Sequence, residues 1–216
     1  MDTEFARQQM IAQQVRAWDV TELNVLNVIS AVARENFVPQ GYRDLAFADT
    51  AIPLGHGQKM MTPIVEGRML QTLMITRSDR VLEIGTGSAY ITACLAALAS
   101  SVYSLDIYND FVSSAASKLE QAGLSNVELA CMDACLELPD EEFDAIAITA
   151  SLPRFDPRFV SALRPGGRMF AVIGEPPVRE ARLIVRGRES DWTSTVFFET
   201  DLAPLVNFPI GNRFRF

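Results

Sequence analysis

The feature that most constrains the fold is a series of five short apolar runs that begins at residue 80. They read RVLEIG, SVYSLD, VELACMD, FDAIAITA and GRMFAVIG, and the last ends at residue 174. Helical patterns lie at residues 89–99, 110–121 and about 156–163. Strands this apolar, alternating with helices, are typical of a parallel sheet that is buried on both faces. The chain is therefore predicted to be an α/β protein with a central, mostly parallel sheet and helices on both faces.

The segment after this series predicts an antiparallel hairpin at the edge of the sheet. Residues 180–205 contain two alternating runs, joined by a turn near Glu189 to Asp191. The tail at residues 207–216 is too short to fold alone and is expected to lie on the surface or on a partner.

Two amphipathic helices are predicted ahead of the sheet as an N-terminal cap. In residues 4–18 the apolar side chains fall roughly on one face, namely Phe5, Met10, Ile11, Val15 and Trp18. A second helix is predicted to begin at Thr21 and to continue, until Pro39 stops it, through Leu23, Leu26, Ile29 and Val32. The chain of 216 residues contains no flexible linker, so residues 1–78 and 79–216 are expected to form one domain.

Residues 40–60 are predicted to be an irregular loop, because Gly41, Pro53, Gly55 and Gly57 interrupt every pattern there. Long loops in compact domains are usually functional. A helix is then predicted from Pro63 to about Ile75, with Thr62 as its N-cap. The stretch GHGQKMMTP at residues 55–63 is either a linker or part of an active site, and nothing inside it decides between the two.

Composition excludes several classes of function. The formal net charge is −8 and no cluster of Lys or Arg exists, which argues against a partner that is nucleic acid or an acidic membrane. The N-terminus does not resemble a signal peptide, and the longest apolar run is too short to cross a bilayer. Cys94, Cys131 and Cys135 form no CxxC pair and no metal site with the single His56. They are expected to be reduced thiols of a cytoplasmic protein, packed in its core.

The most informative motif is VLEIGTGSAY at residues 81–90, a strand followed by a glycine turn into a helix. Gly85 and Gly87 allow a tight turn and a close approach of a ligand. A dinucleotide site needs a third small residue where this chain has Tyr90, and a phosphate-binding P-loop needs a Gly-Lys-Ser/Thr ending that is absent. Such a loop could serve a dinucleotide, a phosphate or S-adenosylmethionine, and the first two fit this sequence badly.

Three acidic residues at strand ends favour S-adenosylmethionine. Glu83 lies beside the glycine turn, where its charge would repel a pyrophosphate but suit a ligand with an ammonium and a sulfonium. Asp106 ends the second strand, where a carboxylate can accept both hydroxyls of a ribose. Asp133 ends the third strand, where it can meet an adenine amino group. The alternative is that each acid only caps the helix or turn that follows it.

With these motifs the sequence resembles class I S-adenosylmethionine-dependent methyltransferases, and among them the protein-L-isoaspartate O-methyltransferase family. The similar segments are ENFVPQGYRDLAFADTAIPLGHGQ, the glycine loop with Ala89 in place of the last glycine, the MDA at 132–134, LRPGGRMF and the LAPL at 202–205. The resemblance covers nearly the whole chain. It implies a Rossmann-like cytoplasmic repair enzyme that methylates the α-carboxylate of isoaspartyl residues in damaged proteins, with an unknown oligomeric state.

The resemblance also implies roles for individual residues. Residues 1–78 would then carry the substrate loop, and residues 79–216 would form the cofactor-binding core. Catalytic roles fall on Met61 and Thr62. Substrate binding falls on His56, Gln58, Lys59 and Pro204. Cofactor binding falls on Met60, Glu83, Gly85, Thr86, Gly87, Asp106, Ile107, Asp133, Ala134 and Thr149. No metal is expected.

The chain departs from the family at one place. Where the family has Thr-Ile-Ser after Gly-His-Gly-Gln, this chain has Lys59, Met60 and Met61. An ionised carboxylate needs no general base, so the lost serine removes a positioning hydrogen bond worth roughly 1.5–3 kcal/mol and not the reaction itself. Thr62 could supply another hydroxyl and Lys59 could attract an anion, unless Thr62 only caps the helix and Lys59 is only solvated. Three hypotheses remain: isoaspartyl methylation, methylation of another acceptor, and cofactor binding without catalysis.

Overall fold

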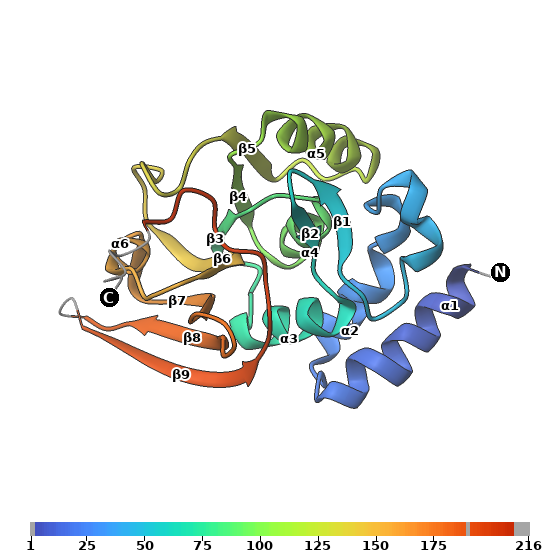
Figure 1. Ribbon diagram of the computed structural model, residues 1–216, viewed down its shortest axis with the longest axis horizontal. Coiled ribbons are helices and arrows are strands. Elements are labelled where there is room, and N and C mark those ends of the chain that lie inside the picture. The colour runs from blue at the N-terminus through green and yellow to red at the C-terminus, as the bar shows by residue number, and fades with distance from the viewer. Residues whose placement is uncertain (1–2, 189–190, 210–216) are drawn as a thin grey trace, which may run out of the picture.

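A computed structural model describes residues 3–188 and 191–209, and within them the chain forms the predicted α/β sheet (Figure 1). Seven strands pair in the order β5-β4-β3-β6-β7-β8-β9. Their bounds are Arg80–Ile84 (β3), Ser101–Asp106 (β4), Val127–Cys131 (β5), Phe143–Leu152 (β6), Leu163–Ile173 (β7), Glu180–Arg186 (β8) and Trp192–Glu199 (β9). The five strands β3 to β7 are parallel, and β8 and β9 form the predicted antiparallel edge. Two residues of the predicted turn, 189–190, lie outside the described residues.

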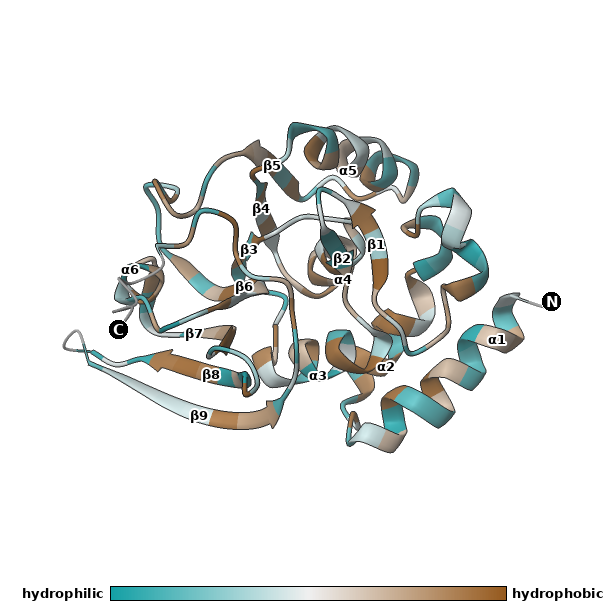
Figure 2. Ribbon diagram, viewed as in Figure 1, coloured by the Kyte–Doolittle hydropathy of each residue, from teal (hydrophilic) through white to brown (hydrophobic). Residues whose placement is uncertain are grey.

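Both faces of the sheet are buried, as the apolar strands predict. Along β6 alternate side chains enter two separate cores: Ala145 and Ala147 belong to one, and Ile146 and Ile148 to the other. The helices are α4 (Tyr90–Leu98), α5 (Asn109–Gln121) and α6 (Pro157–Ser161), close to the predicted ranges. The first core includes residues of α4 and α5, and the second includes Phe159 of α6. Strand β8 carries a long hydrophobic stretch, as does α2 in the N-terminal cap (Figure 2).

The first helix of the N-terminal cap differs from its prediction in two details. Helix α1 (Thr3–Met10) continues through a π turn at Ile11–Val15 and a 3-10 turn at Arg16–Trp18. Met10, Ile11 and Val15 are buried, but Phe5 and Trp18 are 62% and 53% exposed. At 3.6 residues per turn Phe5 lies about 140° around the helix from Met10, so the two cannot share a face.

The second helix is shorter than predicted. Helix α2 spans Leu23–Ala31 and does not begin at Thr21. It ends because Val32 adopts an extended conformation, with ψ of 111°, and a 3-10 turn follows at Arg34–Asn36. The change of direction carries Arg34 into the interior, where it is fully buried.

The prediction of an irregular loop over residues 40–60 is wrong. A 3-10 helix spans Gln40–Leu45, and β1 (Ile52–Gly55) and β2 (Gln58–Met60) form an antiparallel hairpin, with Ile52 opposite Met60. Its turn requires three positive φ angles, 121° at Gly55, 49° at His56 and 71° at Gly57. Glycine and proline therefore shape a tight hairpin here, whereas the sequence suggested only an interruption.

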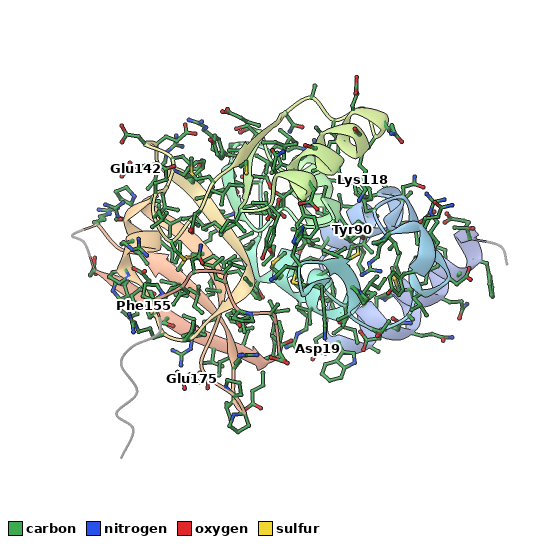
Figure 3. The ribbon with its side chains drawn as sticks, turned by 45° about the horizontal axis from the view of Figure 1, so that its top comes forward. Asp19, Tyr90, Lys118, Glu142, Phe155 and Glu175 are labelled. Atoms are coloured by element: carbon green, nitrogen blue, oxygen red, sulfur yellow. The ribbon has the colours of Figure 1, made fainter. Side chains whose placement is uncertain are left out.

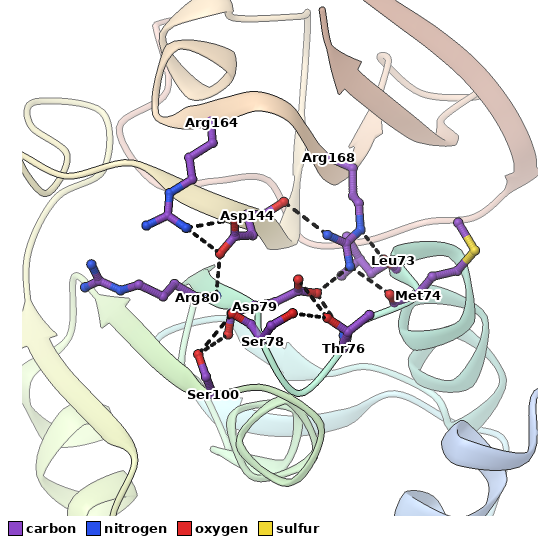
Figure 4. Close-up of polar contacts among 10 residues, drawn as sticks. All are labelled: Leu73, Met74, Thr76, Ser78, Asp79, Arg80, Ser100, Asp144, Arg164 and Arg168. Carbon is purple, nitrogen blue, oxygen red and sulfur yellow. Dashed lines mark hydrogen bonds and ion pairs between the residues drawn. The ribbon is translucent and has the colours of Figure 1, made fainter.

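Helix α3 (Pro63–Leu73) begins at Pro63 as predicted, but the side chain of Thr62 makes no capping hydrogen bond. The helix ends before the predicted Ile75 because Met74 adopts a left-handed conformation with φ of 47°. Arg168 of β7 then donates to the carbonyl oxygens of Leu73 and Met74 and to Asp79 (Figure 4). These bonds fix the end of α3 to the amino-terminal edge of the sheet.

The N-terminal cap is also fixed to the glycine turn. Lys118 of α5 donates to the carbonyl oxygens of Phe37 and Ser88, and it lies on the side of α5 that approaches the cap (Figure 3). In residues 3–188 and 191–209 we find no helix with the length and hydropathy of a membrane span.

Candidate active site

Two adjoining cavities lie at the carboxyl ends of β3, β4 and β6. The larger, of about 570 Å³ and open to solvent, is lined by Leu54, Gln58, Lys59, Ile84, Gly85, Gly87, Leu105, Asp106, Ile107, Tyr108, Phe111, Met132, Asp133, Ala134, Thr149, Ala150, Pro204, Leu205 and Val206. The smaller, of about 310 Å³, is lined by Leu54, Lys59, Met60, Met61, Glu66, Glu83, Gly85, Thr86, Gly87, Ser88, Ile91 and Thr149. The residues that line both cavities form their boundary.

The glycine turn forms part of this boundary and leaves no room for a Cβ atom at Gly85. Gly85 has φ of 101°, and a Cβ atom there would lie 2.3 Å from Oγ1 of Thr149. That hydroxyl in turn donates to the carbonyl oxygens of Ile84 and Gly85. Gly87 has φ of 49°, and Leu54 of the β1–β2 hairpin packs over it. Ala89, in the position of the family's last glycine, also adopts a left-handed conformation, with φ of 69°.

Asp106 is held beside the larger cavity by the backbone. One carboxylate oxygen accepts from the N–H of Gly87 at 2.9 Å, and the other accepts from the N–H of Tyr108 at 3.0 Å. Burial raises the pKa of Asp106, although these backbone hydrogen bonds act against the rise. Each oxygen retains a lone pair, so the carboxylate can accept the two hydroxyls of a ribose.

Asp133 and Pro204 also line the larger cavity. Asp133 accepts from the N–H of Cys135 and from the amide of Asn207, which fixes its orientation. Pro204 is held there by a parallel bridge to Ser151 at the end of β6. Ile107, Ala134 and Thr149, which the resemblance assigned to cofactor binding, line the same cavity.

Glu83 lines the smaller cavity but does not supply the expected charge. Its side chain is fully buried, and one oxygen accepts from the hydroxyls of Thr92 and Ser104. Burial raises the pKa of Glu83 to about 8, against the opposing effect of these hydrogen bonds. The carboxyl group is therefore mostly protonated at neutral pH, which corrects the electrostatic argument made for it.

This pKa predicts a change in stability with pH. The pKa of Glu83 rises from 4.5 to about 8 on folding, so its stabilising contribution is complete below pH 4.5 and is lost as the pH rises through 8. From pH 5 to pH 9 the free energy of unfolding of the natural protein should fall relative to that of Glu83→Gln by about 4 kcal/mol. Denaturant unfolding at both pH values measures this. Glu128→Gln removes an exposed carboxylate and is the control, which should lose as much stability between the two pH values as the natural protein does. If Glu83→Gln and Glu128→Gln lose equal amounts of stability, the raised pKa of Glu83 is contradicted.

Strand β2 and Met61, which follows it, supply most of the residues that the resemblance placed on the substrate side of the site, together with Met60 from the cofactor set. Met60 and Met61 are buried and line the smaller cavity, Gln58 lines the larger one, and Lys59 lines both. Thr62 lines neither cavity. Its hydroxyl is thus not at the site where a substitute for the family's serine would act.

His56 also lies outside both cavities. Its ring stacks on Tyr108 at 4.0 Å between ring centroids, and its Nε2 atom lies 2.9 Å from the carboxylate of Asp110. The histidine thus attaches the tip of the hairpin to the start of α5. The geometry supports a role in holding the hairpin over the site and does not support direct contact with a small ligand.

A buried ion pair that the sequence did not predict holds the loop from behind. Arg34 donates to both carboxylate oxygens of Glu66, to the carbonyl oxygen of Met61 at 2.7 Å, and to that of Ala46. Burial acts to lower the pKa of Arg34, but the attraction and hydrogen bonds of Glu66 outweigh it and the pKa is raised. The guanidinium therefore stays charged and fixes the backbone at Met61.

Comparison with known proteins bears on what this site does. The model of the family described as Protein-L-isoaspartate(D-aspartate) O-methyltransferase (PCMT) matches residues 6–207. Protein-L-isoaspartate O-methyltransferase 1 of Anaeromyxobacter sp. (strain Fw109-5) is 36% identical over 203 residues, which are 93% of each chain. Protein-L-isoaspartate O-methyltransferase of Koribacter versatilis (strain Ellin345) is 33% identical over 201 residues, 93% of this chain and 90% of the relative.

The fold is also similar to solved structures. A Plasmodium falciparum protein, described as a putative protein-L-isoaspartate O-methyltransferase in complex with S-adenosyl-L-homocysteine, superposes with a TM-score of 0.81 and 17% identity. The match covers 95% of this chain and 98% of that one. At this identity the likeness concerns the fold.

Proposed function

Because the chain belongs to the protein-L-isoaspartate(D-aspartate) O-methyltransferase family, we propose that its two cavities bind S-adenosylmethionine and the carboxylate that it methylates. Membership makes the protein an S-adenosylmethionine-dependent methyltransferase that acts on damaged protein. The observation that carries the residue assignment is the position of Asp106 beside Gly85 and Gly87 at the wall of the larger cavity.

In this proposal the larger cavity holds the adenosine and the smaller one receives the amino-acid end of the cofactor. Asp106 accepts the ribose hydroxyls, Asp133 faces the adenine, and Gly85 allows the backbone to approach the sulfur. Calorimetry with S-adenosylmethionine, S-adenosylhomocysteine and NAD tests the assignment: the first two should bind, and tight binding of NAD would overturn it.

The cofactor supplies an electrophilic methyl group, and the protein's task is to orient the acceptor and to exclude water. A carboxylate at neutral pH is already a nucleophile, so an in-line displacement needs no general base. Met60 and Met61, both buried, provide the apolar walls that keep water from the reacting atoms. Arg34 donates a hydrogen bond to the carbonyl oxygen of Met61 and thereby fixes the backbone that carries these two side chains.

The identity of residue 61 predicts the strength of the activity. A thioether offers no useful hydrogen-bond donor to a carboxylate, so the natural protein should methylate isoaspartyl peptides weakly. Met61→Ser should raise this activity about tenfold, which corresponds to about 1.4 kcal/mol. Transfer of labelled methyl groups to an isoaspartyl peptide measures it. Met60→Ser places the hydroxyl one residue away and should give no gain.

Two results would count against this proposal. Robust turnover of isoaspartyl peptides by the natural protein would mean that backbone groups position the acceptor without a hydroxyl. If Met61→Ser gives no gain, even combined with Lys59→Thr and Met60→Ile, another acceptor is favoured and the same labelled-methyl assay screens for it. Cofactor binding without transfer to any acceptor would favour a non-catalytic role.

The partners that fit this proposal are proteins or peptides with a carboxylate acceptor. The net charge of −8 opposes nucleic acid and acidic membranes as partners. The three cysteines, all free, suit the reducing environment of a cytoplasm. Buried Cys94 and Cys135 fit the expected packing role, whereas Cys131 is exposed.

A further inference from the structure

Lys59 is the single cationic side chain among the described residues that line the two cavities. The other charged residues there are acids: Asp106 and Asp133 in the larger cavity, and Glu66 and Glu83 in the smaller one. Lys59 stands on β2 at the boundary, where it lines both cavities. Its ammonium takes part in none of the ion pairs found within residues 3–188 and 191–209.

The acids of the smaller cavity cannot serve as partners that hold this ammonium. Glu66 is committed to Arg34 through two hydrogen bonds, and the carboxyl group of Glu83 is fully buried behind the glycine turn. The ammonium is therefore an unmatched positive charge at the junction of the two cavities. A ligand that spans the junction would place one anionic group against it.

We propose that Lys59 binds the carboxylate of the amino-acid end of S-adenosylmethionine, an assignment that rests on the proposed function. The cofactor carries one carboxylate beside its ammonium and sulfonium groups, and its adenosine lies in the larger cavity. Its amino-acid end must then pass the boundary formed by Leu54, Lys59 and Gly85. Lys59 is the group of opposite charge at that point.

The alternative partner of Lys59 is the carboxylate of the acceptor, and the reaction itself argues against it. The acceptor loses its negative charge during methyl transfer, so a cation held against it stabilises the reactants more than the transition state and slows the reaction. The carboxylate of the cofactor keeps its charge throughout. A cation on that group gives affinity without opposing the transfer.

The test compares two ligands that differ in the carboxylate alone. Calorimetry measures the binding of S-adenosylmethionine and of decarboxylated S-adenosylmethionine to the natural protein and to Lys59→Gln. Because Lys59 is exposed, we expect its loss to weaken the binding of S-adenosylmethionine about five- to tenfold. The affinity for the decarboxylated ligand should stay unchanged. Lys59→Arg should retain most of the affinity. Arg77→Gln also removes one positive charge, but at the end of β3 opposite to the glycine turn. It should change the affinity for neither ligand.

Each other outcome has a definite meaning. If Lys59→Gln weakens the binding of both ligands equally, or of neither, the assignment of Lys59 is overturned and the proposed function still stands. In that case a raised KM for the peptide in Lys59→Gln would assign the residue to the acceptor. If the natural protein binds no S-adenosylmethionine, the proposed function fails and this inference fails with it.

Discussion

Replacing Arg34 with methionine is expected to lower the free energy of unfolding by about 3–5 kcal/mol. The substitution leaves the Glu66 carboxylate buried without its partner, and it also removes the donors to the carbonyl oxygens of Ala46 and Met61. Arg34 and Glu66 are 0% and 2% exposed in their side chains, so water cannot replace the lost bonds. Denaturant unfolding at neutral pH measures the change.

The double variant Arg34→Met/Glu66→Leu separates stability from positioning. Replacing both charges by apolar groups should recover much of the stability, because no buried charge remains unpaired. It does not restore a donor to Met61, so methyl transfer should stay several-fold slower while cofactor affinity is largely kept. If the double variant regains full kcat, Arg34 has a purely structural role. If it is no more stable than Arg34→Met alone, the ion pair is not what holds the two segments together.

Replacing Gly85 with alanine is expected to weaken the binding of S-adenosylmethionine more than a hundredfold. The new Cβ would meet Oγ1 of Thr149 at 2.3 Å, and the residue would have to keep a φ of 101° that alanine rarely adopts. Relief requires a shift of the turn that forms the boundary of both cavities. Overpacking of this kind costs about 1–3 kcal/mol, and the left-handed conformation adds about 1–2 kcal/mol.

Two matched variants identify the source of this loss. Gly123 also has a positive φ, of 71°, but nothing lies within 4 Å of its Cβ position. Gly123→Ala should therefore cost stability through backbone strain alone and leave affinity unchanged. Thr149→Ala removes the clashing oxygen, so Gly85→Ala/Thr149→Ala should bind more tightly than Gly85→Ala. If adding Thr149→Ala gives no improvement, the clash is not the cause.

The sheet was predictable from sequence because its signal is local. Each strand from β3 to β7 is a short apolar run, and each face of β6 enters a separate core. The hairpin β1–β2 was not predictable in this way, since its strands have four and three residues and contain Pro53 and Gly55. The positive φ angles at the turn give it its shape, and composition alone indicated only a loop.

The meeting of the glycine turn with Asp106 and Asp133 at one cavity was predictable for a related reason. Carboxyl ends of parallel strands meet at one edge, so the glycine turn, Asp106 and Asp133 had to converge. Arg34 and Glu66 are 32 positions apart, and a change of direction after α2 brings them together. No local sequence pattern predicts this ion pair. Leu54, Tyr108 and Phe111 were also missed. Tyr108 lies two residues after β4 and Phe111 lies in the first turn of α5, and this position after a strand end was the one available signal.

The contacts of the β1–β2 hairpin have a consequence for the order of events in turnover. Leu54 packs over Gly87 and His56 stacks on Tyr108, so the hairpin leans across one wall of the cavity assigned to the cofactor. A spent cofactor that leaves on this side must first break both contacts, whereas an acceptor approaching from solvent need not. Where breaking these contacts limits departure of the by-product, the rate measured at saturating peptide reports how long the hairpin stays closed, and weakening the stack with Tyr108→Ala should raise that rate.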